Sequence, residues 1–309
     1  MGFPVDTGVA NYSSTGASNT SKFIPQIWSG KLVESLYDAT VFGEIANTDY
    51  EGEIKAHGDE VIIRTVPAIT IRNYVKGQTL TYEQPESPNV SLKIDQGKYF
   101  AFKVNSVDKY QSDLNLMDDW ATDGGERMKI AVDTDILGTI YTDAHASNAG
   151  ATAGRKSANI NLGVTATPLA LTKANVIDAI VDYNTVLDEQ NVAETGRWCV
   201  IPARMAGLIK KSDLKDASMT GDDKSILRNG RIGMIDRMTM YISNNLAVAA
   251  GKWNVVFGHK AGLTFAGQIT EMDEIDNPND FGRLIRSLFV YGFEVIKPEC
   301  IGHSVVTLS

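Results

Sequence analysis

The sequence predicts an α+β protein in which an extended β ribbon, one long helix and a separate helix–strand–helix unit follow one another. Three observations support this prediction. Apolar and polar residues alternate within residues 60–111, apolar residues recur at helical spacing over 113–143, and a short apolar strand stands between two helices within 172–214. A chain of 309 residues is long enough for one large or two moderate domains.

The chain is expected to begin with a mobile arm. Residues 1–20 are rich in Gly, Ser, Thr and Asn, and they lack the basic start and apolar run of a secretory signal. We therefore expect a chain that starts out in the cytoplasm. Pro25 then opens a short amphipathic helix that carries Trp28 as an aromatic anchor.

The ribbon is predicted to contain strands with one apolar and one polar face. Residues 90–95 and 100–105 both alternate in this way, and Pro85 and Pro88 place a loop at about 75–88. Because an isolated two-stranded hairpin is only marginally stable in water, the ribbon needs a surface to pack on. That surface belongs either to its own domain or to another chain.

One helix is predicted from about 113 to 143, with a kink, a break into two helices or a close crossing at Gly124-Gly125. The small-residue loop 145–168 is predicted to be an internal boundary. The remaining elements are expected to form a unit with its own sheet, followed by a closing pair of strands outside that unit. They are helices at 172–187 and 203–214, strands at 197–202, 238–242 and 253–258, and the closing strands at 284–296 and 301–308.

Composition excludes several classes of protein. The 43% hydrophobic and 22% charged content is typical of a globular chain, and no stretch approaches the ~20 apolar residues of a membrane span. The net charge of −9 argues against a protein that wraps nucleic acid with a continuous basic surface, so any contact with DNA is expected to be weak. Cys199 and Cys300 have no metal-like spacing and favour neither a disulfide framework nor a zinc site.

The sequence contains no common catalytic motif. The Gly-Lys pairs do not continue as a phosphate-binding loop, and dinucleotide, nucleophile-elbow and zinc-protease motifs are absent. Cys199 with His259 is the best candidate for a thiol nucleophile and base, although an apolar strand around Cys199 favours burial. The acidic segment 271–280 offers oxygen ligands for Ca²⁺ or Mg²⁺, but a solvated loop or an acidic edge that meets a neighbour is the simpler interpretation. We predict no enzyme activity, no cofactor and no metal.

Several stretches resemble coat-protein segments of tailed bacteriophages with the Hong Kong 97 type fold. They are Phe23-Ile24-Pro25-Gln26-Ile27-Trp28-Ser29, Arg197-Trp198-Cys199-Val200-Ile201-Pro202 and Tyr291-Gly292-Phe293-Glu294-Val295. Their order, together with the order of arm, ribbon, long helix and α+β unit, is similar to that family from about Ser21 onward. The resemblance implies a major capsid protein that assembles into the icosahedral shell around the viral DNA.

The resemblance also implies a division of the chain. Residues 1–49 would form the N-terminal arm and short helix, 50–110 the extended β loop, 111–172 with 277–309 the peripheral domain, and 173–276 the axial domain. In this family the extended loop lies over the adjacent subunit. The resulting candidates for subunit contacts are Trp28, Tyr74, Lys76, Gln78, Tyr82, Glu83, Glu271, Asp273 and Glu274. Lys76 is the one tempting lysine for a cross-link, but no partner or activating acid is identifiable, so we predict none.

As partners, the resemblance implies further copies of the chain in hexamers and pentamers, a separate scaffolding protein and a portal. It allows a decoration protein and weak, non-specific contact with packaged DNA, and it places the protein in the virion after assembly in the host cytoplasm. Two alternatives stay open: the shell of an encapsulin-like bacterial nanocompartment, and a thiol-dependent enzyme that uses Cys199 and His259.

Overall fold

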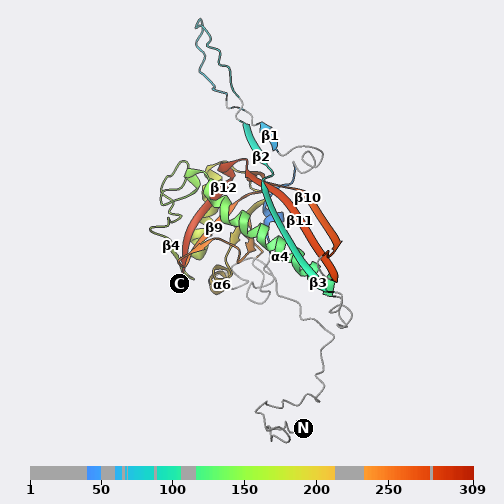
Figure 1. Cartoon of the computed structure of the whole chain (residues 1–309). Coiled ribbons are helices and arrows are strands. Elements are labelled where there is room, and N and C mark those ends of the chain that lie inside the picture. The colour runs from blue at the N-terminus through green and yellow to red at the C-terminus, as the bar shows by residue number, and fades with distance from the viewer. Residues whose placement is uncertain are drawn as a thin grey trace, which may run out of the picture.

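The computed structural model describes residues 40–49, 60–64, 67, 69–86, 89–105, 116–212, 233–278 and 281–309. The predicted N-terminal arm, the short helix with Trp28 and the start of the predicted long helix lie outside these residues. The described chain is an α+β protein, as the sequence predicted, and it consists of a projecting hairpin, a long sheet lined by one helix, and a wider sheet (Figure 1).

The helices are α1 (Phe42–Ile45), α4 (Leu116–Thr139), α5 (Val176–Glu189) and α6 (Ala203–Lys211), with short 3-10 helices η1 (Ile140–Asp143), η2 (Ala146–Asn148), η4 (Lys260–Gly262) and η5 (Pro298–Cys300). The strands are β1 (Glu60–Arg64), β2 (Asn89–Lys93), β3 (Gln96–Asn105), β4 (Leu169–Leu171), β5 (Arg197–Ile201), β6 (Met234–Ile235), β7 (Met238–Ile242), β8 (Val248–Ala249), β9 (Lys252–His259), β10 (Leu263–Asp276), β11 (Gly282–Val295) and β12 (Ile301–Leu308).

The wider sheet has seven strands, in the order β4-β12-β9-β5-β7-β6, with β8 paired to β9. Its centre is β5, which pairs in parallel with β7 and antiparallel with β9. The expected closing pair of strands is not formed, because β12 enters this sheet between β9 and β4 while β11 belongs to another sheet. The C-terminal strand therefore completes the α+β unit instead of lying outside it.

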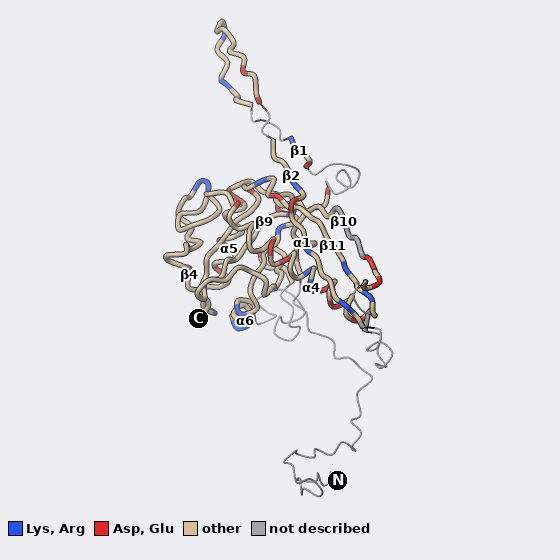
Figure 2. Tube along the Cα trace, viewed as in Figure 1, with Lys and Arg blue, Asp and Glu red and all other residues tan. Residues whose placement is uncertain are grey.

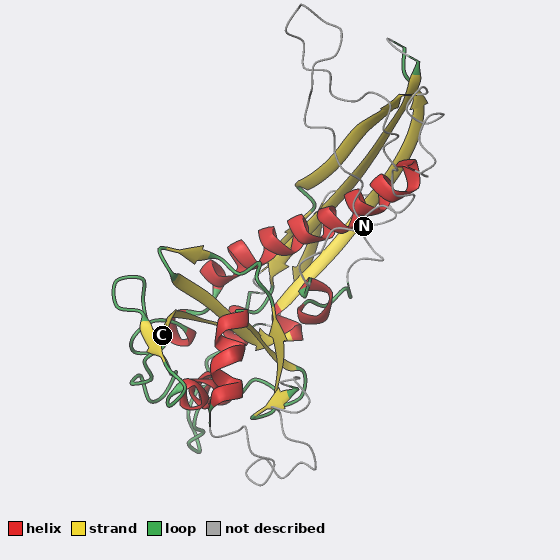
Figure 3. Ribbon diagram, turned by 90° about the horizontal axis from the view of Figure 1, so that it is seen from below, coloured by secondary structure: helices red, strands yellow, loops and turns green. Residues whose placement is uncertain are grey.

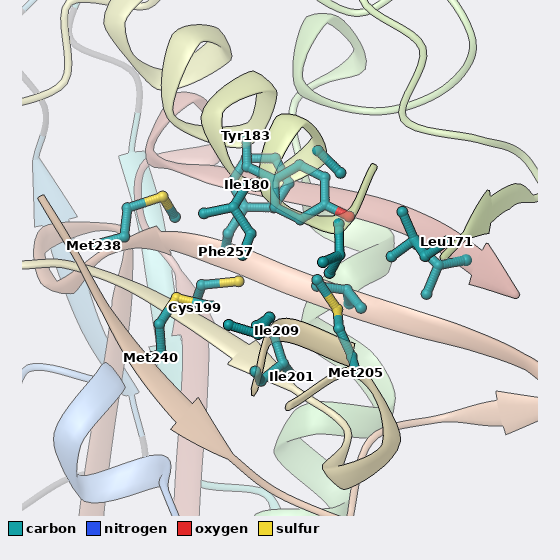
Figure 4. Packing of buried hydrophobic residues seen from close by; sticks show 14 of the residues in the cluster. Leu171, Ile180, Tyr183, Cys199, Ile201, Met205, Ile209, Met238, Met240 and Phe257 are labelled. Carbon is teal, nitrogen blue, oxygen red and sulfur yellow. The ribbon is translucent and has the colours of Figure 1, made fainter. Parts of the chain in front are cut away.

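The seven-stranded sheet has a hydrophobic core on each face, because side chains alternate along β5. Cys199 and Ile201 point into a core that α5 and α6 cover (Figure 4). Trp198 and Val200 point to the opposite face, into a core shared with α1 and α4. The apolar strand that the sequence predicted is thus buried on both faces, as expected for a central strand.

The long sheet has three strands in the order β10-β11-β3, and α4 runs along it (Figure 3). The strand at 96–105, which was expected to be part of the ribbon, pairs along its whole length with β11. Phe102 also makes an edge-on contact with Trp120 of α4, at a ring centroid distance of 5.8 Å. This stretch therefore packs on its own subunit, which is one of the two alternatives that the sequence left open for the ribbon.

The prediction of one continuous helix is confirmed, because α4 passes through Gly124-Gly125 without a break. The reason for Gly124 is a close crossing: a Cβ placed there would lie 3.1 Å from the ring of Phe100. Gly125 has nothing within 4 Å of a Cβ, so close packing concerns only the first glycine.

Loop 145–168 is tied to the wider sheet and does not separate two domains. The buried Asn148 donates hydrogen bonds to the carbonyl oxygens of Glu299 and Ile301, at 2.8 and 3.0 Å, and accepts one from Gln190. Its small residues suit close packing, and the boundary predicted from them was wrong.

Candidate assembly surfaces

The projecting hairpin is attached to its own subunit at its root. β1 and β2 pair antiparallel, and Ile63, Leu92 and Ile94 pack on Ala266 and Ile296 in a small core of their own. The backbone is also close there, because a Cβ on Gly292 would lie 2.0 Å from the carbonyl oxygen of Lys93. The alternation in the sequence predicted the inward-facing side chains, but it gave no sign of the distant residues they contact.

The tip of the hairpin, residues 69–86, turns at Lys76-Gly77, where Gly77 has a φ of +89° and Gln78 donates its amide to the carbonyl of Val75. The Gln78 side chain accepts from the Val75 amide at 3.1 Å. Glycine is needed at this position because a φ in the left-handed region strains other residues. Lys76 stands at the apex, exposed to solvent.

Several polar side chains of the tip bond to other groups of the tip. Arg72 donates to Thr81 and lies 3.9 Å from the carboxylate of Glu83, which also accepts from the amide of Thr70 at 2.6 Å. Side chains next to these in sequence point the other way in an extended segment. Accordingly, Ile71 and Tyr82 are 91% and 90% exposed.

The exposed tip is strongly apolar for a surface. Ile69, Tyr74, Val75 and Leu80 are exposed together with Ile71 and Tyr82, and the tip stands clear of the rest of the described chain (Figure 1). The predicted candidates Tyr74, Lys76, Gln78, Tyr82 and Glu83 all lie here. An exposed apolar patch at the end of an arm is typical of a protein–protein contact.

The other predicted candidates lie far from the tip, in the outer half of β10. The segment 271–280 was expected to be a solvated loop or an acidic edge that meets a neighbour. Instead β10 extends to Asp276, and Asp273 and Glu274 pair with arginines of β11 in the same subunit. Asp273 accepts from Arg286 at 2.7 Å, and Glu274 from Arg283. Glu271 lies opposite Leu288 in the register. The two arginines, spaced for an antiparallel hairpin, were the available signal for a strand. Trp28 lies outside the described residues.

A hollow of about 550 Å³ lies beside the root of the hairpin and is lined by acids from three elements. Asp95 follows β2, Asp143 ends η1, and Glu294 belongs to β11. Burial raises the pKa of Glu294, and the charges of Asp143 and Asp95 raise it further. No group of His, Cys, Asp and Glu that could hold a metal ion occurs in the described part of the chain.

The candidate thiol dyad is not formed. Cys199 is fully buried among apolar side chains, and burial raises the pKa of its thiol. His259 is held elsewhere, with Nε2 2.7 Å from the carbonyl oxygen of Thr195 and Nδ1 accepting from the amide of Ala261. A thiol kept neutral in a hydrophobic core is a poor nucleophile. The interpretation as a thiol enzyme is therefore not supported.

Two acids of α4 that have no catalytic signature hold the subunit together. Asp133 is fully buried, and its carboxylate accepts from the amides of Val41 and Phe42, both at 2.9 Å, and from Asn245 at 2.8 Å. Asp135 accepts from Tyr291 at 2.8 Å and pairs with Lys98. Residues two apart point to different sides of a helix, so α4 is fixed on both sides. Neither role is predictable from the sequence, since all partners lie far away in the chain.

No helix in the described residues is long and apolar enough to cross a membrane. Comparison with known proteins then gives the family. A family model described as phage capsid protein matches residues 89–303, and a search of curated proteins gave no match.

Solved structures with similar folds come from phages and related particles. One from Mycobacterium phage Che8 has 26% sequence identity and a TM-score of 0.78, and the match covers 93% of this chain and 97% of that one. The capsid of cyanophage P-SCSP1u has 14% identity and a TM-score of 0.69, covering 99% and 98%. The capsid of a native GTA particle has 15% identity and a TM-score of 0.68, covering 96% and 100%.

The family model spans well over half of the chain, and the described fold has the peripheral helix, long sheet and projecting hairpin of the Hong Kong 97 type. The shell-forming interpretation is favoured over a nanocompartment or an enzyme. The chain therefore belongs to the phage capsid protein family and is a major capsid protein of the tailed-phage type.

Proposed function

We propose that, within the shell, the hairpin of each subunit is the arm that holds a neighbouring copy. The observation that supports this proposal is the tip itself. Several of its polar groups bond to other groups of the tip, while Ile71 and Tyr82 are almost fully exposed. A monomeric protein gains nothing from such a surface, whereas a subunit that is covered by its neighbour does.

The root and the tip have different tasks in this mechanism. The root is fixed to its own subunit by Ile63, Leu92 and Ile94, so the arm leaves in a defined direction. The tip then buries its apolar face on the neighbour, which stabilises the contact by roughly 25 cal/mol for each Å² of apolar surface removed from water. The paired charges Arg72 and Glu83 keep the arm extended before it docks.

The division of the chain is also a proposal, and the strand pairings support a modified version. We propose an arm that comprises 50–93, because β3 pairs with β11 and so joins the peripheral part with α4. The axial part is then 145–262 with β12, because loop 145–168 and β4 belong to the wider sheet, whereas β10 pairs with β11 in the long sheet. Residues 1–49 remain the proposed N-terminal arm.

The remaining partners follow from the shell function. We propose assembly in the host cytoplasm with a separate scaffolding protein and a portal, with room for a decoration protein on the finished shell. Contact with packaged DNA is proposed to be weak, since the chain carries a net charge of −9. Trp28, Glu271, Asp273 and Glu274 are proposed as further contact residues, and Lys76 is proposed to make a non-covalent contact from the apex.

A deletion tests the arm. Removing residues 70–88 is expected to leave a folded subunit, because none of these residues belongs to the cores of the two larger sheets. Thermal unfolding would report the fold, and electron microscopy of the expressed chain with its assembly partners would report shells. Normal shells from the deleted chain would refute the proposal.

A further inference from the structure

We propose that neighbouring copies in a ring of subunits meet through two helices of opposite charge, the acidic face of α5 on one copy against the basic face of α6 on the next. The inference rests on the shell function and on the axial position proposed above for α5 and α6. It deepens both, because it names the contact that closes the ring.

The outward face of α5 is acidic and partly apolar. Asp178, Val181 and Asp182 follow one another at helical spacing, and Val181 is 43% exposed. Within the described residues neither carboxylate has an ion-pair partner, whereas Asp188 on the same helix pairs with Arg197 and Arg237. Burial raises the pKa of Asp182, and the charge of Asp178 raises it further. A nearby cation would relieve this repulsion.

The outward face of α6 is basic and contains no acid. Arg204 and Lys211 are exposed and lie seven residues apart, so they share one face of the helix, with Lys210 beside them. In the described chain none of the three has an ion-pair partner. By contrast, Arg283 and Arg286 both pair with carboxylates of their own subunit. Within the described residues, these three cations are therefore available to another copy.

The two helices contact each other and cover the same face of the seven-stranded sheet. Figure 4 shows Ile180 and Tyr183 of α5 reaching the core from one side and Met205 and Ile209 of α6 reaching it from the other. Figure 2 shows the basic residues of α6 in blue, and within the described residues they form no ion pair with the acids of α5. A second copy can bring an acidic face and a basic face together.

This arrangement suits a head-to-tail ring. In such a ring each copy offers two different surfaces, one to each neighbour. The ring closes when the rotations between successive copies add up to a full turn. Every copy has a net charge of −9, so most contacts between copies are repulsive. An acidic face against a basic face is attractive, and it also fixes the direction in which copies follow one another. Gly207 lies between the bases with open space around it, which lets a neighbour approach.

Charge reversal tests the contact. One variant reverses α5 (Asp178→Lys with Asp182→Lys), a second reverses α6 (Arg204→Glu with Lys211→Glu), and a third combines all four changes. We expect each single-helix variant to fold with an unchanged melting temperature but to give about tenfold fewer rings and shells, and the combined variant to regain them. A control, Arg155→Glu with Lys297→Glu, changes net charge as the second variant does and should assemble normally.

Mixing the two single-helix variants gives a sharper result. The variant with reversed α5 then has two basic faces, and the variant with reversed α6 has two acidic faces. The two variants can therefore alternate around a ring with an even number of copies. Hexamers are expected to form from the mixture, but pentamers are not, and closed shells should be missing. Native mass spectrometry or electron microscopy of the rings distinguishes these outcomes.

The outcomes separate this inference from the arm proposal. Rings with wild-type yield from either single-helix variant, or no recovery in the combined variant while all variants stay folded, would overturn it. Failure of the 70–88 deletion to affect shells would count against the arm alone, because that deletion leaves α5 and α6 unchanged.

Discussion

At the scale of single residues, Arg197 shows how one buried side chain organises the axial part. Its guanidinium has no exposed area and donates to the carbonyl oxygens of Val192 and Ala193, at 2.6 and 2.9 Å, and to Asn184. It also pairs with Asp188 at 2.7 Å. One planar donor group thus joins the end of α5 to the start of β5.

We therefore predict that Arg197→Met lowers the free energy of unfolding by roughly 2–4 kcal/mol, because the buried Asn184 and the partly buried carbonyl groups of Val192 and Ala193 lose their donor at once. The matched control is Arg237→Met, which removes an exposed partner of the same Asp188 and should lower the free energy of unfolding much less, because solvent screens an exposed ion pair. Chemical denaturation of the unassembled subunit measures the change in the free energy of unfolding for each substitution. Equal effects of the two substitutions would contradict the assigned role.

His303 gives a prediction about pH. Asn254 donates its amide to the carbonyl of Ala247, so its oxygen accepts from Nε2 of His303 at 2.9 Å, and Tyr141 packs on the ring. Burial lowers the pKa of His303 from 6.5 to about 4. Between these values the unfolded chain binds more protons than the folded one, so stability falls as pH decreases from 6.5 towards 4.

The loss from this histidine alone should reach roughly 3 kcal/mol at the acid end of that range. Thermal unfolding of wild type and His303→Gln from pH 7 to pH 4 isolates it, since carboxylates contribute equally to both proteins. Above pH 6.5 the difference between the two should be constant. A constant difference across the whole range would show that His303 does not titrate as described.

At the scale of elements, α4 offers a comparison of adjacent glycines. Gly125→Ala should raise the free energy of unfolding by about 1 kcal/mol, because alanine favours the helix and nothing lies within 4 Å. Gly124→Ala should gain less or lose stability, since its Cβ would lie 3.1 Å from the Phe100 ring. Denaturant unfolding measures the free energy of unfolding of both variants. Equal gains in stability would contradict the close crossing of α4 and β3.

The elements also show how far the sequence could predict the fold. Periodicity predicted α4, α5, α6 and β5, because their burial patterns are local properties. Periodicity could not predict that β3 pairs with β11. Nor could it predict that β12 joins the wider sheet. Those pairings depend on residues far apart in the chain, and an amphipathic strand such as 100–104 has the same pattern whichever partner it finds.

The candidate contact residues follow the same rule. The turn of the tip was predictable, since Lys76-Gly77 forms it, and residues 69–86 are all exposed. The acidic run around Asp273 was misjudged because its partners, Arg283 and Arg286, come from the returning strand. For Asp133, the partners at Val41 and Asn245 lie about a hundred positions away, and nothing local marks it.

At the scale of the whole molecule, the subunit has two kinds of surface for its neighbours. The axial part offers charged helices, whose attraction is screened within about 8 Å at physiological salt, while the arm offers an apolar face that salt does not weaken. Raising the salt concentration should therefore loosen contacts around the ring before it loosens contacts made by the arm.

The apolar face of the arm can be tested without deleting it. Ile71→Asp with Tyr82→Asp adds two charges to side chains that are 91% and 90% exposed, so the melting temperature of the subunit should not change. Shell yield should fall about tenfold or more, because a charge buried in an interface without a partner is costly. The control, Asn161→Asp with Thr165→Asp, adds the same charges to loop 145–168 and should assemble normally. If the arm variant builds shells as well as this control does, the apolar face does not touch a neighbour, and the hairpin must hold the shell by its backbone or its apex alone.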